Sequence, residues 1–323
     1  MKFSPRVFLL PFILAAATST FAQHLITTVP VGTQPSAIAV NQKTNEIYVA
    51  NAVSGTVSVI DGTSNTVTTT ITVGNNPSAV IVNPTSNTIY VNNATDKTLS
   101  IIDGSTNTVS RTVPLPFGFN QAVQLGLSKY LYVTDTAANT VHVVDLTVLR
   151  PIADVPVTQP SYVTVSPAGH KVYVTEKGRG VAVIDTTSNT VVNTFTVEPN
   201  TQVSTISVDP VTNLLYVTTN AVGSGNFSVE VLDANTGSSL GSTVALGVVN
   251  DVLALPGSGR AVATGGKQQG QYEHSLIFIN GSTLDVTGVL GVGNNPGPVT
   301  YNTATRIAYV ANLASNNVAV VGN

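Results

Sequence analysis

The feature that most constrains this chain is a short segment that recurs at a nearly constant spacing. Each copy contains Tyr-Val, and a Val-rich run that ends in Ile-Asp or a close variant follows a few residues later. Seven copies can be aligned, one of them degenerate, and their first residues are Tyr48, Tyr90, Tyr132, Tyr173, Tyr216, Ala261 and Tyr309. A spacing of 41 to 48 residues is typical of a repeat that holds four short strands.

Each repeat contains four runs rich in Val, Ile and Thr, which favours strands. An inner strand follows a Gly-x-x-Pro-Ser loop, and the later strands lie at Tyr-Val, at Val-x-Val-Ile-Asp and at Thr-Val-x-x-Thr. Asp, Gly and Asn between the third and fourth runs indicate turns. No segment after residue 22 predicts a helix. The sequence therefore predicts an all-β fold, a seven-bladed β-propeller with four-stranded blades.

The two ends of the chain complement each other. The final repeat stops after its third strand, at residues 318–321, while residues 25–29 form a fourth strand with no repeat before it. Pairing the N-terminal strand with the C-terminal blade would complete the seventh sheet and leave no exposed edge. We therefore predict that the ring is closed in this way.

Residues 1–22 have the pattern of a secretory signal peptide. Lys2 and Arg6 precede an apolar run at 7–17, and a small-x-small cleavage site ends at Ala22. A retained membrane anchor is the rival interpretation, but the run is shorter than the roughly 20 residues that span a bilayer. We expect cleavage near Ala22, a single propeller domain over residues 23–323, and a secreted, periplasmic or cell-surface location.

The composition limits the partners. Only 9% of the residues are charged and the net charge is -3, so no positive field attracts nucleic acid. The chain has no cysteine, which excludes disulfides, thiolate chemistry and a lipid anchor on cysteine. The sequence leaves a protein, a glycan or a small molecule as the ligand, with no transmembrane segment in the mature chain.

The segments Tyr-Val-Ala-Asn at 48–51, Tyr-Val-Asn-Asn at 90–93 and Tyr-Val-Thr-Asp at 132–135 resemble the repeat of the YVTN-type β-propeller family. The resemblance extends over the whole chain after residue 22. It implies a seven-bladed propeller that is often exported or displayed on the cell surface. It implies no single activity, because related propellers include lactonase-like enzymes, the virginiamycin-type lyase and electron-transfer modules.

Departures from the repeat mark candidate binding residues on one face of the ring. The upper face is defined here as the face with the loops that join fourth to first strands and second to third strands. The residue after the loop proline should ring the channel mouth there, at Ser36, Ser78, Gln121, Ser161, Ser204, Asp251 and Gly297. Asp251 is the single charge in that ring. Phe117 and Phe119 precede Gln121 and form a pocket wall, or else plug the channel or cover a blade edge.

Two loops between second and third strands concentrate charge on the expected upper face. One contains Glu176, Lys177 and Arg179. The other is an insertion in the sixth repeat, and its candidate residues are Lys267, Tyr272, Glu273 and His274. These groups could supply acid, base and cationic functions around the channel mouth, although a solvated loop explains the insertion equally well.

The remaining chemistry is restricted. The four histidines are too dispersed for a metal centre, and segment 233–237 resembles the start of a calcium loop but lacks its closing acid, so a plain turn is favoured. No cofactor is expected. His142 and Glu230 replace small residues of third strands and need local partners. An enzyme would rely on His274 or Glu176 as base, with Arg179 or Lys267 stabilising an anion.

The sequence favours an exported, non-enzymatic propeller that presents its upper-face loops as a binding or interaction scaffold. The alternative is an extracytoplasmic lactonase-like or lyase-like enzyme with acid and base residues at the channel mouth. A propeller subunit that serves a redox partner or a cell-surface layer is a third option, although no haem-attachment motif supports the redox version.

Overall fold

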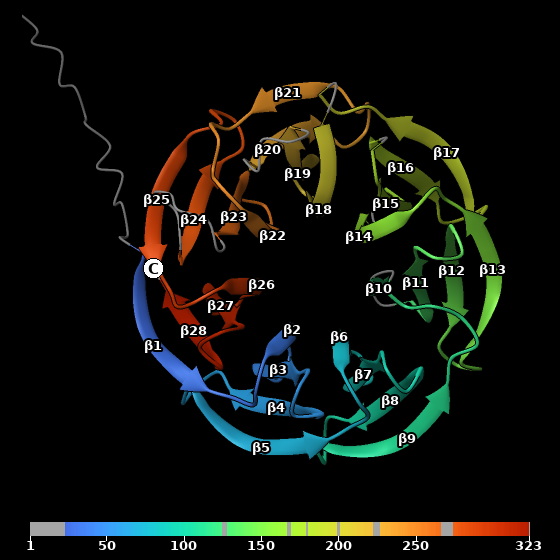
Figure 1. Cartoon of the computed structure of the whole chain (residues 1–323), viewed down its shortest axis with the longest axis vertical. Coiled ribbons are helices and arrows are strands. Elements are labelled where there is room, and N and C mark those ends of the chain that lie inside the picture. The colour runs from blue at the N-terminus through green and yellow to red at the C-terminus, as the bar shows by residue number, and fades with distance from the viewer. Residues whose placement is uncertain are drawn as a thin grey trace, which may run out of the picture.

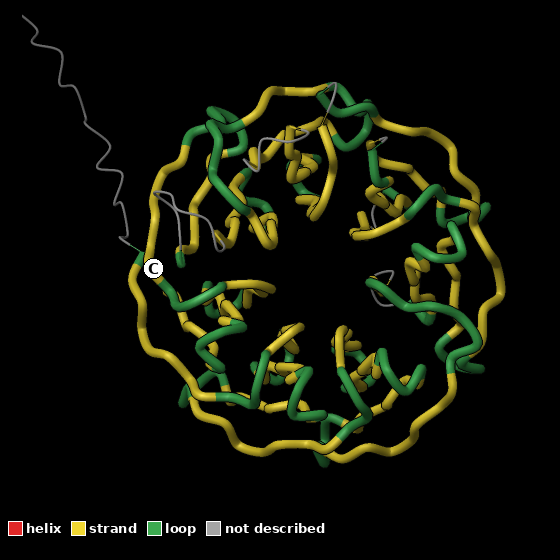
Figure 2. The backbone as a smooth tube through the Cα atoms, viewed as in Figure 1, coloured by secondary structure: helices red, strands yellow, loops and turns green. Residues whose placement is uncertain are grey.

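A computed structural model describes residues 23–124, 128–166, 169–178, 180–198, 201–221, 227–265 and 274–322. Every regular element within these ranges is a β-strand (Figure 2). Accordingly, no helix among the described residues has the length and apolarity to cross a membrane. The predicted leader, residues 1–22, lies outside these ranges.

The strands form seven antiparallel sheets of four strands each, arranged as blades around a ring (Figure 1). The first, innermost strands are β2 (Pro35–Asn41), β6 (Pro77–Asn83), β10 (Ala122–Gln124), β14 (Pro160–Ser166), β18 (Thr201–Asp209), β22 (Val249–Leu255) and β26 (Pro296–Asn302). The second strands are β3 (Glu46–Asn51), β7 (Thr88–Asn93), β11 (Tyr130–Asp135), β15 (Lys171–Glu176), β19 (Leu214–Ala221), β23 (Arg260–Gly265) and β27 (Ile307–Asn312). The third strands are β4 (Thr56–Asp61), β8 (Thr98–Asp103), β12 (Thr140–Asp145), β16 (Gly180–Asp185), β20 (Phe227–Asp233), β24 (Ser275–Asn280) and β28 (Asn317–Gly322). The outermost strands are β5 (Thr66–Thr72), β9 (Thr108–Pro114), β13 (Arg150–Pro156), β17 (Thr190–Phe195), β21 (Ser239–Ser242), β25 (Val286–Gly291) and β1 (His24–Pro30).

The predicted fold class and ring closure are both confirmed. Blade 7 takes its outer strand β1 from the start of the described chain and its other three strands from the end (Figure 1). The register runs from His24 opposite Gly322 to Pro30 opposite Asn317, with one irregularity between Leu25 and Thr27. Val29 of β1 is 3% exposed and packs in an apolar cluster that joins blades 7 and 1.

In most blades, a tyrosine of the second strand contacts the following blade. Tyr48 of blade 1 is fully buried and packs against Ile89 of blade 2. Its hydroxyl lies 3.1 Å from Asn107 Oδ1 in the turn between the third and fourth strands of blade 2. Tyr132 makes the same hydrogen bond to Asn189 of the following blade at 2.7 Å. These rings therefore act as apolar and polar contacts between neighbouring sheets.

The turns between third and fourth strands follow the Asp, Gly and Asn pattern of the sequence. Asp61 Oδ1 accepts a hydrogen bond from the backbone N–H of Thr63 at 2.8 Å, and such bonds hold the pKa of Asp61 below its usual value. Segment 233–237 forms a turn of this kind, since Asp233 Oδ1 accepts backbone N–H groups of Asn235 and Thr236, both at 2.8 Å. The segment that resembles the start of a calcium loop is thus an ordinary turn between two strands.

Blade 6 departs from the pattern at its second strand. The sequence aligned Ala261 with the repeated tyrosine, but the register places Val262 there, because Val262 lies opposite Phe278 as Tyr48 lies opposite Val59. That one-residue alignment was wrong, since no tyrosine marks the position in this blade. Blade 6 therefore lacks the ring that should extend toward blade 7.

Candidate functional site

A cavity of about 460 Å³ opens at the upper face where the inner ends of the seven blades meet. Every first strand, or the residue just before it, contributes to the wall. The polar side chains among its described lining residues are Ser36, Gln121, Tyr162, Thr164, Ser207, Asn250, Asp251 and Asn295. We call this space the central cavity. Its size lies within the range of small-molecule sites.

Gln121, Tyr162 and Asp251 occupy the same position in their blades, which is the position of Ala37 in blade 1. Blade 1 has a bulged residue, Ser36, and the next residue, Ala37, lies opposite Ala50 of the second strand. Asp251 lies opposite Thr264 in the same relation, and Asn250 takes the bulged place. The ring read from the sequence was therefore shifted by one residue in blade 6, where Val249 replaces the loop proline.

The same shift applies to blade 3. The N–H of Thr134 donates to the carbonyl of Gln121 at 2.8 Å. The next residue, Ala122, lies opposite Val133 as Ile38 lies opposite Val49, so Gln121 also matches Ala37. In blade 4 the matching residue is Tyr162, next to Ser161. Sequence reasoning missed Tyr162, although its place two residues after a loop proline, where blades 1 and 2 have alanine, was a usable signal.

Asp251 is held in place by the backbone, and the described residues of the cavity wall include no lysine or arginine. Its Oδ1 accepts the N–H of Val252 at 2.9 Å and its Oδ2 accepts the N–H of Val299 at 3.1 Å. Desolvation outweighs both bonds and raises the pKa of Asp251 to about 7. Burial, with a contribution from the Asp251 charge, raises the pKa of Tyr162 to about 12. The pair can thus donate or accept protons in hydrogen bonds near neutral pH.

Phe117 and Phe119 do not line the central cavity. Both pack against the apolar cluster that joins blades 2 and 3. The centroid of the Phe117 ring lies 4.4 Å from that of His142, with the planes tilted by 36°. Asn92 Nδ2 donates to the carbonyl of Phe119 at 3.4 Å. Both rings also line a separate cavity of about 480 Å³, together with Asn92, Lys97 and Asp135, so they form a pocket wall away from the central cavity.

Glu176 is the last residue of β15 and is 7% exposed. Its Oε1 accepts the backbone N–H of Thr158 at 3.0 Å, in the loop that enters blade 4. Asn93 has the same role in blade 2, where Oδ1 accepts the N–H of Gly74 at 3.0 Å. Lys177 follows in an exposed turn. Neither Glu176 nor Lys177 lines the central cavity, and Glu176 already serves as a structural acceptor.

His274 lies just before β24 with a positive φ of 59°, and its carbonyl accepts the N–H of Val292 at 2.9 Å. It does not line the central cavity either. Arg179, Lys267, Tyr272 and Glu273 lie outside the described residues. Of the sequence candidates, Gln121 and Asp251 line the central cavity, together with Ser36 and Gly297 of the predicted ring.

The two buried groups that needed local partners have them. His142 is 7% exposed, and its Nδ1 lies 2.7 Å from Asp154 Oδ1 while its Nε2 lies 3.5 Å from Asp135 Oδ2. Glu230 is 1% exposed and accepts the backbone N–H of Glu198 at 3.1 Å. Across the part of the chain that the structure describes, no group of three or more His, Asp or Glu residues is arranged to hold a metal ion.

Comparison with known proteins agrees with the fold. The family model described as YNCE-like beta-propeller matches residues 12–125, about the first third of the chain. Hydrazine synthase of Kuenenia stuttgartiensis superposes with a TM-score of 0.76 at 18% identity, over 91% of this chain and 97% of that chain. The Cps50 (Swd1) beta-propeller domain of Myceliophteria thermophila gives 0.74 at 11%, over 94% and 100%. At identities this low, the similarity shows the fold alone. A search of curated proteins finds no match.

Proposed function

We propose that this seven-bladed β-propeller, whose repeats are of the YVTN type, is an exported, non-enzymatic binding scaffold. The observation that carries the proposal is the cluster of Gln121, Tyr162 and Asp251, three departures from a small repeat residue that line one cavity. A scaffold position needs only a small side chain there, as Ala37 and Ala79 demonstrate in blades 1 and 2. Export is supported by the leader-like pattern of residues 1–22.

The cavity wall suits a polar ligand that presents hydroxyl or amino groups. Gln121 offers an amide with donors and an acceptor, Tyr162 a hydroxyl, and Asp251 a carboxyl group whose protonation changes near neutral pH. Among the described residues, no lysine or arginine lines the cavity, so this part of the wall offers an anionic ligand no counter-charge. A sugar, a polyol or an amine matches these groups better than an acid does.

Binding should depend on Gln121 and Asp251. A glycan and metabolite screen by ligand-observed NMR, on protein beginning at Gln23, is expected to find a polar ligand, and Asp251→Asn and Gln121→Ala should each weaken it about tenfold. Loss of one hydrogen bond to a charged or polar partner is worth about 1–3 kcal/mol, which gives that factor. Lys43→Ala, in a lower-face turn, is the matched control. Equal affinity in the Asp251→Asn, Gln121→Ala double variant and the native protein would refute the site.

The pKa of Asp251 predicts a specific pH dependence of stability. Since the folded value is raised from 3.8 to about 7, the folded protein binds a proton more tightly than the unfolded chain does. Stability from this group is then fully present below about pH 4 and is lost as the pH rises through 7. The melting temperature of Asp251→Asn relative to the native protein should therefore rise between pH 4 and pH 8. A constant difference between the two proteins would contradict the raised pKa.

The second candidate function is a lactonase-like or lyase-like enzyme, which the raised pKa of Asp251 supports. A carboxyl group with a pKa of about 7 beside a tyrosine hydroxyl suits general acid or base catalysis at neutral pH. The acid and base would then be Asp251 and Tyr162, in place of Glu176 and His274. Lactone hydrolysis that disappears in Asp251→Asn would favour this alternative over the scaffold.

A further inference from the structure

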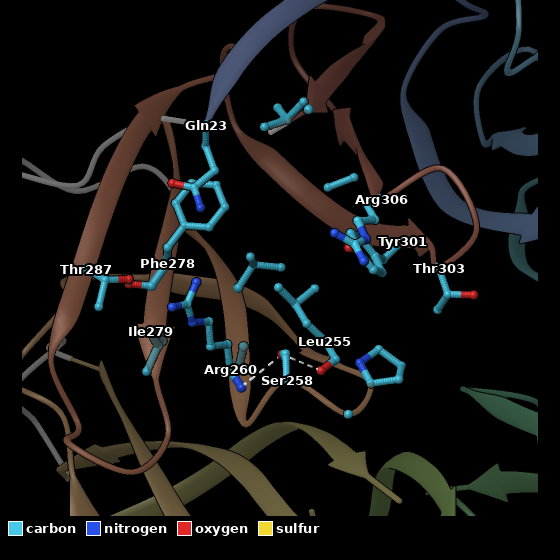
Figure 3. A pocket seen from close by; sticks show the side chains of 17 residues that line it. Gln23, Leu255, Ser258, Arg260, Phe278, Ile279, Thr287, Tyr301, Thr303 and Arg306 are labelled. Atoms are coloured by element: carbon cyan, nitrogen blue, oxygen red, sulfur yellow. Dashed lines mark hydrogen bonds between the residues drawn. The ribbon is translucent and has the colours of Figure 1, made fainter. Parts of the chain in front are cut away.

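A second cavity, of about 400 Å³, lies between blades 6 and 7 (Figure 3). We call it the blade 6–7 pocket. Its mouth is formed by the loops between first and second strands of both blades, through Ser258 and Thr303, so it opens on the lower face, away from the central cavity. Phe278 of β24 and Tyr301 of β26 contribute rings to its walls.

The pocket exists because two side chains are small at the same blade interface. Between blades 1 and 2, Tyr48 packs against Ile89. Between blades 6 and 7, Val262 takes the place of the tyrosine, and Ala308 takes the place of the isoleucine. Phe278 stands where blade 1 has Val59 and fills part of the space. A well-packed interface would not leave this volume empty, because lost contacts cost stability.

The pocket is cationic in a chain that carries a net negative charge. Arg260 and Arg306 lie on opposite sides of it (Figure 3), and its lining, within the part of the chain that the structure describes, includes no acidic residue. Among the described residues, neither guanidinium has an ion-pair or hydrogen-bond partner. Asp209 lies behind the loop and is occupied by the backbone N–H of Gly257 at 2.9 Å. Two unpaired arginines beside one cavity favour a bound anion.

Beside the arginines, the wall combines apolar and aromatic side chains with the polar side chains of Gln23, Ser258, Thr287 and Thr303. Phe278 is 7% exposed, and Val262 and Ala308 are almost completely buried behind it. Tyr301 lies beside Arg306, whose positive charge partly offsets the burial that raises the pKa of Tyr301. A ligand that fits must therefore combine an anionic group with a compact apolar body. Inorganic phosphate alone would leave the apolar part of the space unfilled.

We propose that the blade 6–7 pocket binds a small organic anion, with its carboxylate or phosphate group between Arg260 and Arg306 and its apolar ring against Phe278. A guanidinium pairs with either acid group through two parallel N–H···O bonds. The missing tyrosine supplies the space that the ring occupies. This site is separate from the central cavity, so it does not depend on the proposed function.

The test uses two probes that share a ring, benzoate and phenyl phosphate, and benzamide as the neutral control. Isothermal titration and NMR chemical shifts at millimolar probe should show saturable binding of at least one anion and none of benzamide. Stronger binding of one anion identifies the acid group that the site prefers. The Arg260→Gln, Arg306→Gln double variant should weaken binding at least about tenfold. Arg111→Gln, an exposed arginine of β9, is the matched control and should bind as the native protein does.

A second variant tests the cavity itself. The Val262→Tyr, Phe278→Val double variant restores the tyrosine and valine pair found in blade 1, so it should fill the pocket and abolish probe binding without loss of folding. Asp251→Asn should leave probe binding unchanged, which separates this site from the central cavity. No binding of either anion, or undiminished binding after loss of both arginines, would overturn the proposal.

Discussion

Val29→Asp is expected to open the propeller ring. Val29 lies in β1, is 3% exposed, and packs against Val318 and Val320 of β28 and against the apolar face of blade 1. An aspartate there would place a carboxylate in an apolar cluster that offers no cation. Removing the valine contacts and burying that group should lower the free energy of unfolding by about 3–5 kcal/mol. Chemical denaturation gives this difference, and limited proteolysis should cut β1 first.

The same strand provides the control. Thr28 is adjacent, points to the opposite side and is exposed, so Thr28→Asp adds the same charge to the same backbone without burying it. Its unfolding free energy should stay within about 0.5 kcal/mol of the native value. Equal stability of Val29→Asp and Thr28→Asp would mean that β1 contributes little to closure.

Tyr48→Ala is the second large effect. The ring is fully buried between blades 1 and 2, where it touches Ile89, and its hydroxyl bonds to Asn107 at 3.1 Å. Truncating a large buried ring leaves a cavity that the rigid sheets cannot close, so we expect a loss of about 3–5 kcal/mol in unfolding free energy. Differential scanning calorimetry or urea denaturation measures it.

Tyr48→Phe separates the ring from its hydroxyl. It keeps the apolar contacts and removes only the hydrogen bonds, so a loss of about 1 kcal/mol is expected. If the alanine and phenylalanine variants lose equal stability, the hydroxyl rather than the ring joins the blades. If both are as stable as the native protein, the tyrosine is not a structural contact, and the explanation of the blade 6–7 pocket fails with it.

Blade number and closure were predictable because they rest on features repeated throughout the sequence. The spacing of the tyrosines sets the blade length, and the incomplete final repeat requires residues 25–29 as its fourth strand. A pattern present in seven copies tolerates an error in any one of them. The fold therefore followed from periodicity alone.

The candidate site was harder to predict because its residues lie where the repeat fails. In blade 6, Val249 stands in place of the loop proline and Val262 in place of the repeated tyrosine. Without these two markers, the sequence alignment of this blade with the others was wrong by one residue. A shift of one residue in a strand moves a side chain to the other face. Glu176 misled in a different way. Its charge indicated a loop site, whereas the register places it in the structural slot of Asn93.

The pairing of β1 with β28 also constrains the order of folding. The strand at residues 24–30 pairs with a strand almost 300 residues later in the chain. It therefore has no strand partner until that last segment has been made. During synthesis, six sheets can assemble from neighbouring segments while this first strand remains an unpaired edge. Such late, long-range pairing is slow and exposes the chain to aggregation. A chaperone that shields the early strand until residue 322 emerges would therefore speed maturation more than one acting on any central blade.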